Sequence, residues 1–120
     1  MKTILIIDDD ESIRSMFRIK FEKTYHVIEA ENGRKGLTAF KTSQPDLVIT
    51  DIIMPEEEGF KTILDIKKLN PNVSIIAITG MPQIGALHSL EIAKEFGAVK
   101  GFVKPINLRE LEMAIEELII

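Results

Sequence analysis

The chain has 120 residues, of which 45% are hydrophobic and 28% charged, so we expect one globular domain over residues 1–120, with no room for a second hydrophobic core. The formal net charge of -4 argues against a surface that binds nucleic acid or an anionic membrane, since both favour basic residues. Cysteine is absent, which excludes disulfides, thiolate metal sites and cysteine nucleophiles. Because neither a signal peptide nor an apolar run long enough to span a membrane is evident, we expect a cytoplasmic protein.

Short apolar runs alternate along the chain with segments in which apolar residues recur every three or four positions. The runs are rich in β-branched residues and are uninterrupted, as in strands buried on both faces of a parallel sheet. The segments between them have the periodicity of amphipathic helices. In chain order we expect strands at residues 4–7, 26–28, 47–50, 73–78 and 99–103. We expect helices over residues 11–23, over a short segment that ends at about residue 42, through 60–67, over 84–96 and over 108–118.

This alternation of strands and helices predicts an α/β fold, in which helices cover both faces of a doubly wound parallel sheet. Two residues mark helix ends. Gly97 follows the expected fourth helix and is suited to its C-cap. Asn107 precedes the last helix and is suited to its N-cap.

Polar side chains follow the strands at the point where each one ends. Three aspartates, residues 8–10, come directly after the first strand, and Asp51 follows the third. Thr79 ends the fourth strand, and Lys104 follows the fifth. Because the carboxyl ends of parallel strands meet at one edge of the sheet, we expect these side chains to lie close together.

Carboxylates that lie close together repel each other and need a cation. With only two histidines in the chain, that cation is expected to be a hard one held by oxygen, such as Mg²⁺. Carboxylates, Mg²⁺, a hydroxyl and an ammonium are the groups that phosphoryl transfer uses. Taken singly, Asp10 and Glu11 suit the start of a helix and Lys104 an ordinary surface position, so the prediction rests on the combination.

The same residues resemble the receiver domain of two-component response regulators. The matching motifs are Asp8-Asp9, the segment from Asp51 to Pro55 with Gly59 after it, Thr79-Gly80 and Lys104-Pro105. They occur in order at strand ends, and the resemblance covers the whole chain. It implies a flavodoxin-like (βα)5 fold with strand order 2-1-3-4-5.

The resemblance also implies roles for the acidic residues. Asp51 would be the phosphoacceptor, taking a phosphoryl group from the phosphohistidine of a sensor histidine kinase or a histidine phosphotransfer protein. Asp9, Asp51 and the backbone carbonyl of Ile53 would ligate Mg²⁺, with Asp8 close by and often acting through a water. The protein would then be a signalling switch that promotes its own phosphorylation and dephosphorylation, and not a turnover enzyme.

Lys104 would pair with the phosphoryl oxygens, and Thr79 would move toward the phosphoryl group and relay its presence. The Lys104-Pro105 bond is expected to be cis by the same resemblance. One residue departs from the family pattern, since Gly101 stands where an aromatic residue usually assists the threonine. Phe102 should point to the opposite face of its strand, into the core.

The resemblance implies partners as well: a histidine kinase or phosphotransfer protein, an output domain or target protein of unknown identity, and a phosphorylation-dependent dimer. Direct binding of nucleic acid or membrane is not expected. Two apolar residues, Ile53 and Met81, are expected to flank the path of the water that hydrolyses the phosphorylated form.

Three other interpretations remain open. The spacing Asp-x-Asp-x-Ser at residues 8–12 is close to the nucleophile loop of haloacid-dehalogenase-type phosphatases, in which Asp8 would be the nucleophile, but Asp51 would then have no role. A flavodoxin-like cofactor binder needs a phosphate loop after the first strand, where four consecutive acids would repel phosphate. A degenerate receiver used only as a scaffold is disfavoured because no acidic-site residue is missing.

Overall fold

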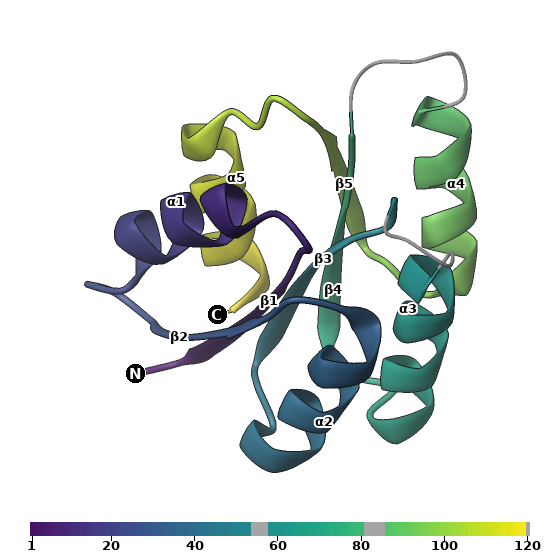
Figure 1. Ribbon diagram of the computed structural model, residues 1–120, viewed down its shortest axis with the longest axis horizontal. Coiled ribbons are helices and arrows are strands. Elements are labelled where there is room, and N and C mark those ends of the chain that lie inside the picture. Colours follow the sequence, from purple (N-terminus) through teal and green to yellow (C-terminus); the bar gives the residue numbers. More distant parts are fainter. Residues whose placement is uncertain (54–57, 81–85, 120) are drawn as a thin grey trace.

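The computed structural model describes residues 1–53, 58–80 and 86–119. The strands are β1 (Thr3–Ile7), β2 (His26–Ala30), β3 (Leu47–Asp51), β4 (Ser74–Thr79) and β5 (Lys100–Val103). The helices are α1 (Glu11–Phe21), α2 (Gly33–Ser43), α3 (Glu58–Leu69), α4 (Ala86–Phe96) and α5 (Leu108–Leu118). The strands form one parallel sheet in the order β2-β1-β3-β4-β5, which confirms the predicted fold and strand order (Figure 1).

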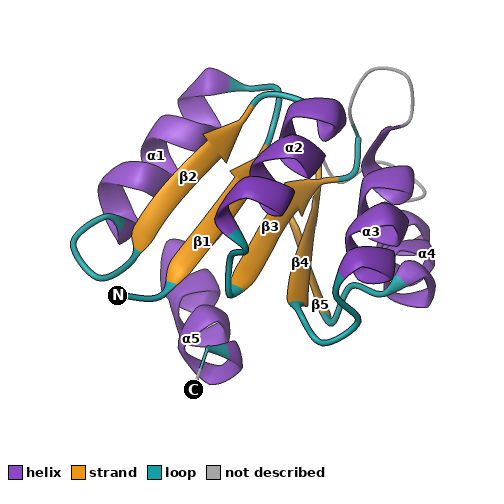
Figure 2. Cartoon of the chain, turned by 90° about the horizontal axis from the view of Figure 1, so that it is seen from below, coloured by secondary structure: helices purple, strands orange, loops and turns teal. Residues whose placement is uncertain are grey.

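Helices cover both faces of the sheet, with α1 and α5 on one face and α2, α3 and α4 on the other (Figures 1 and 2). Alternation along β1 explains why its apolar run is continuous. Ile4 and Ile6 join the core with α1 and α5, whereas Leu5 and Ile7 join the core with α2, α3 and α4. A strand buried on both faces favours apolar side chains along its whole length, and polar side chains begin where its carboxyl end leaves the sheet.

Element boundaries differ from the expected ones by a few residues. Strand β2 runs to Ala30 and not 28, because its pairing with β1 continues through Ile7 and Ala30. Helix α1 ends at Phe21 and not 23, because the amides of Thr24 and Tyr25 both donate to the Phe21 carbonyl and turn the chain into β2. The expected start of the fourth helix, at residues 84 and 85, lies outside the described residues.

Two glycines allow helices to approach the central strands closely. A Cβ atom on Gly36 of α2 would lie 2.4 Å from the Ile7 side chain. A Cβ atom on Gly59 would lie 2.3 Å from the Cα of Ile52, and backbone cannot move aside as a flexible side chain can. Glycine at 59 therefore lets the first turn of α3 lie against the backbone that follows Asp51.

The predicted helix caps are present. The Asn107 side chain accepts a hydrogen bond from the Glu110 amide and caps α5, and Gly97 follows α4 with a φ of 130°, which favours glycine. No helix within residues 1–53, 58–80 and 86–119 is long and apolar enough to span a bilayer.

Candidate functional site

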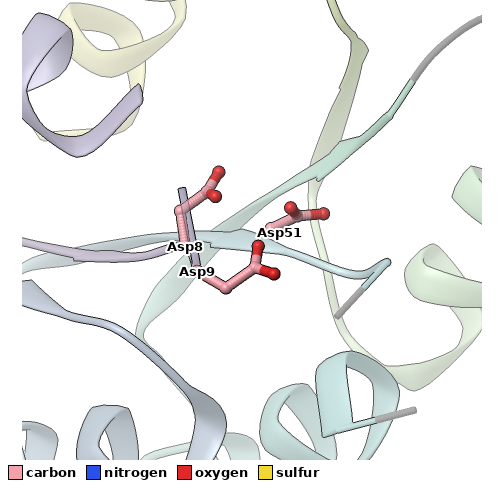
Figure 3. A group of neighbouring side chains, drawn as sticks. All are labelled: Asp8, Asp9 and Asp51. Atoms are coloured by element: carbon pink, nitrogen blue, oxygen red, sulfur yellow. The ribbon is translucent and has the colours of Figure 1, made fainter. Parts of the chain in front are cut away.

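Three carboxylates gather where β1 and β3 end (Figure 3). Ile7, the last residue of β1, is paired with Thr50 of β3, so the residues that follow each of them, Asp8 and Asp51, come side by side. Ligand atoms of Asp8, Asp9 and Asp51 all lie within 4.8 Å of one another. The Asp8 and Asp51 residues are only 1% and 3% exposed, whereas Asp9 is exposed, so the group has a buried base and an open side.

Lys104 brings an ammonium between the two buried carboxylates. Its Nζ lies 3.1 Å from Asp8 Oδ2 and 3.1 Å from Asp51 Oδ2. The backbone holds the lysine here, because its amide donates to the Thr79 carbonyl at 2.9 Å and because β5 is paired with β4. The Lys104-Pro105 bond is cis, as expected.

Backbone amides fix the two buried carboxylates. The Asp10 amide donates to Asp8 Oδ1 at 2.8 Å, and the Ile53 amide donates to Asp51 Oδ1 at 2.9 Å. Asp51 Oδ2 accepts a hydrogen bond from Lys104. Asp8 Oδ2 is buried and accepts no hydrogen bond from the described residues, so its contact with the Lys104 ammonium is an ion pair only.

The pKa values show that negative charge is costly here. Burial, and after it the charge of Asp51, raise the pKa of Asp8 to about 6, although the hydrogen bond from the Asp10 amide and the Lys104 ammonium act to lower it. Burial likewise raises the pKa of Asp51. For Lys104, burial acts to lower the pKa, but the charges of Asp51 and Asp8 outweigh it and the pKa is raised. One ammonium does not balance three carboxylates, so this oxygen-only donor set suits a hard divalent cation.

A family model described as "Response regulator receiver domain" matches residues 4–116. The chain belongs to this family. It is therefore a receiver domain of two-component signalling, and the resemblance noted from the sequence motifs is confirmed.

Curated relatives of this receiver domain differ in length. Sporulation initiation phosphotransferase F of Bacillus subtilis (strain 168) is 31% identical over 95% of this chain and 90% of that protein. Probable transcriptional regulator ycf27 of Cyanophora paradoxa is 32% identical over 98% of this chain, and the DNA-binding transcriptional regulator NtrC of Azospirillum brasilense is 33% identical over 95% of it. The chain spans only 48% and 23% of these two longer proteins.

Solved structures show the same arrangement. The receiver domain protein from Clostridium thermocellum has a TM-score of 0.90 and 31% identity, over 99% of this chain and 94% of that one. The chemotaxis protein CheY4 of Vibrio cholerae has a TM-score of 0.88 and 25% identity, over 98% of each chain.

Thr79 ends β4 of the receiver beside the acidic group. It is 2% exposed and is paired with Val103, the residue before Lys104. Next to it, a Cβ atom on Gly80 would meet no atom within 4 Å. The described part of the chain thus leaves open space at Gly80, the residue that follows Thr79.

Leu90 of α4 occupies the space that an aromatic residue at position 101 would need. A Cβ atom on Gly101 would lie 2.8 Å from Leu90 Cδ2, and Leu90 is buried in the core on that face. Phe102 packs against the opposite core, with α1 and α5, as predicted. The Ile53 side chain is 55% exposed; Met81 lies outside the described residues.

Asp8→Asn is expected to stabilise the metal-free protein at neutral pH. The Asp8 pKa is about 6 when folded, against an ordinary value of 3.8, so the folded protein holds the Asp8 proton more tightly than the unfolded chain does. The stability that comes from this difference is complete below pH 3.8 and is lost as pH rises through about 6. Above that pH a buried charge remains, which asparagine lacks, while Lys104 keeps Asp51 as partner. Thermal unfolding in EDTA should show a higher melting temperature for the variant at about pH 7.5, with a gain that shrinks toward about pH 4. A gain that grows on acidification would contradict this.

The sequence analysis missed one residue that contacts the acidic loop, which is the segment Asp8 to Asp10 between β1 and α1. Arg14 Nη1 donates to the backbone carbonyl of Asp8 at 2.6 Å. The available signal was its place in the first turns of the expected helix, which begins directly after residues 8–10.

Proposed function

We propose that this receiver domain is a phosphoacceptor switch in which Asp51 takes a phosphoryl group from the phosphohistidine of a sensor histidine kinase or a histidine phosphotransfer protein. The observation that carries the proposal is the environment of Asp51. This carboxylate is 3% exposed, contacts the Lys104 ammonium at 3.1 Å and lies beside two further carboxylates. Burying so much charge lowers the stability of the folded protein, and such clusters are typical of functional sites.

In the transfer step an Asp51 carboxylate oxygen forms a bond to phosphorus. The bond between phosphorus and the donor histidine nitrogen breaks, and its electron pair stays on the imidazole. The product is an acyl phosphate on Asp51. Lys104, which already lies against Asp51 Oδ2, pairs with the phosphoryl oxygens and limits their repulsion by the carboxylates.

We propose that Asp9, Asp51 and the Ile53 carbonyl would hold Mg²⁺, with Asp8 acting through a water. The carboxylate oxygens lie within 4.8 Å of one another, a spacing that allows one cation to contact them together. When bound, Mg²⁺ supplies positive charge that offsets the repulsion between Asp51 and the incoming phosphoryl oxygens.

Thr79 and Gly80 would pass the change on to the surface. The Thr79 hydroxyl would turn toward the phosphoryl group, and the open space at Gly80 lies next to it in the chain. Because Leu90 fills the place of the usual aromatic residue at Gly101, we propose that α4 takes part in the response. Because Asp51 of the domain is itself the acceptor, the domain would be a switch that promotes its own phosphorylation and dephosphorylation, and not a turnover enzyme. A cytoplasmic location, an output domain or target protein and dimerisation on phosphorylation belong to the same proposal.

The phosphatase alternative, with Asp8 as nucleophile, fits the geometry less well. The contacts of Asp8 do not decide this, because its Oδ1 accepts a hydrogen bond from a backbone amide and its Oδ2 faces Lys104, as in Asp51. The position of Asp10 does. Asp10, which would be the second carboxylate of that mechanism, accepts a hydrogen bond from the Ser12 amide at 2.8 Å and caps α1. Its carboxylate is thus engaged in holding the helix.

The experiment that tests the proposal is incubation of the protein with acetyl phosphate and Mg²⁺, followed by intact mass measurement. One phosphoryl group should be added, and EDTA should suppress the addition. Labelling that is equal with and without Mg²⁺ would contradict the metal dependence, and no labelling by either acetyl phosphate or a phosphorylated histidine phosphotransfer protein would contradict the function.

A further inference from the structure

We propose that Arg14 is a positioning residue that holds the acidic loop in its metal-binding shape and so raises the affinity for Mg²⁺. This inference rests on the proposed function, since it concerns the same site. Arg14 projects from the first turns of α1, its side chain is 13% exposed, and its Nη1 donates to the Asp8 carbonyl at 2.6 Å. It reaches the backbone of the loop and not the carboxylates.

Strand β2 holds Arg14 in turn. Arg14 Nε lies 3.4 Å from Glu29 Oε1, and Glu29 is the residue before Ala30 at the end of β2. The Ala30 carbonyl accepts the Asp8 amide at 3.1 Å. Both backbone groups of Asp8 are therefore tied to β2, the amide directly and the carbonyl through Arg14 and Glu29.

The carbonyl that Arg14 binds belongs to the peptide unit joining Asp8 to Asp9. A peptide unit is planar, so fixing its carbonyl also fixes the direction in which the Asp9 amide and Cα lie. No hydrogen bond from the described residues holds the Asp9 side chain, which is exposed. The orientation of the Asp9 carboxylate toward Asp51 thus depends on the backbone, and this is the part that Arg14 fixes.

Charge and position predict opposite effects of removing Arg14. If its positive charge were all that mattered, its loss would strengthen Mg²⁺ binding, because one competing cation near the carboxylates would be gone. If Arg14 positions the loop, its loss weakens binding, because the ligands must be ordered at the moment the ion binds. The sign of the change therefore decides between the two roles.

Arg18 provides a matched control on the same helix. Its Nη1 lies 2.7 Å from Glu29 Oε2, so it shares the carboxylate that holds Arg14, and its Nε lies 3.8 Å from Glu22. Within the described part of the chain, its side chain forms ion pairs with these two glutamates and none with the loop. Arg18→Met removes a charge and an α1–β2 ion pair, as Arg14→Met does, but leaves the Asp8 carbonyl bound.

The test compares Mg²⁺ dissociation constants by isothermal titration calorimetry and amide hydrogen exchange in the metal-free protein. Arg14→Met should weaken Mg²⁺ binding about tenfold, the low end of the range for residues that orient metal ligands, and should speed exchange of the Asp10 amide, which donates to Asp8 Oδ1. Arg18→Met should leave both unchanged within about twofold, even where both variants lose similar thermal stability. Arg14→Lys, which cannot bind Glu29 and the carbonyl with a planar fork, should rescue only part of the affinity.

Unchanged or tighter Mg²⁺ binding by Arg14→Met, or an equal loss in Arg18→Met, would overturn the positioning role. If Arg14→Met does not fold, Glu29→Gln takes its place, with a smaller loss of affinity and faster Asp10 exchange expected; no change in either would overturn the proposal. If the wild-type protein binds no Mg²⁺, the proposed metal site fails, while the Asp10 exchange rates still decide whether Arg14 holds the loop.

Discussion

Asp51→Asn is expected to abolish phosphoryl incorporation and to leave the protein folded. The amide oxygen of asparagine carries no negative charge and is not a nucleophile toward phosphorus. Burial raises the pKa of Asp51, so the folded protein loses little by giving up this charge, and Lys104 retains Asp8 at 3.1 Å. Intact mass after acetyl phosphate and Mg²⁺ should show no added group, with thermal unfolding showing a native-like transition.

Asp10→Asn is the matched control for this experiment. Asparagine caps helices as well as aspartate does, so α1 should keep the cap that Asp10 provides through the Ser12 amide, and labelling should continue. The phosphatase alternative predicts the reverse pattern, with labelling retained in Asp51→Asn at Asp8 and impaired in Asp10→Asn. Peptide mapping of any label that remains would locate the nucleophile.

The sequence predicted the fold because its apolar runs report burial directly. Residues 4–7 and 47–50 contain no polar residue except Thr50. Such continuous apolar runs identify central strands that are covered on both faces. Once these strands are parallel, their polar residues must gather at one edge, so the meeting of Asp8, Asp9, Asp51 and Lys104 follows from topology. Strand β2 was less clear, because an edge strand admits polar residues such as Glu29 and its apolar signal fades early.

The remaining features depend on side chains from distant elements, which no local pattern encodes. The reach of Arg14 to the Asp8 carbonyl depends on how α1 lies against β2. The use of Leu90 to fill the space at Gly101 depends on the approach of α4 to β5. Such contacts are set by packing of the whole core, where a change of position by a fraction of an ångström decides which atoms meet.

Asp9→Ala is expected to remove most of the Mg²⁺ affinity at little cost in stability. Its carboxylate is one of the three that come within 4.8 Å of one another, and it is exposed, so no buried contact is lost. Residues that only orient ligands are worth about 10- to 100-fold in metal affinity, so loss of a ligand itself should cost at least about a hundredfold. Calorimetric Mg²⁺ titration measures this loss of affinity. Thermal unfolding in EDTA should show an unchanged or slightly higher melting temperature. The charge of Asp9 acts to raise the pKa of Asp51, so the two carboxylates repel each other and the variant is free of this repulsion.

The neighbouring change, Asp10→Ala, should have the opposite profile. Asp10 accepts the Ser12 amide and caps α1, and replacing an N-cap aspartate by alanine typically costs about 1 kcal/mol of stability. Its carboxylate is not among the three that converge, so Mg²⁺ affinity should change by less than about twofold beyond the effect of lost charge. If Asp10→Ala reduced Mg²⁺ affinity more than Asp9→Ala, the ion would be held by Asp8 and Asp10, as in the phosphatase alternative. Asp51 would then lose the metal on which its proposed role as phosphoacceptor depends.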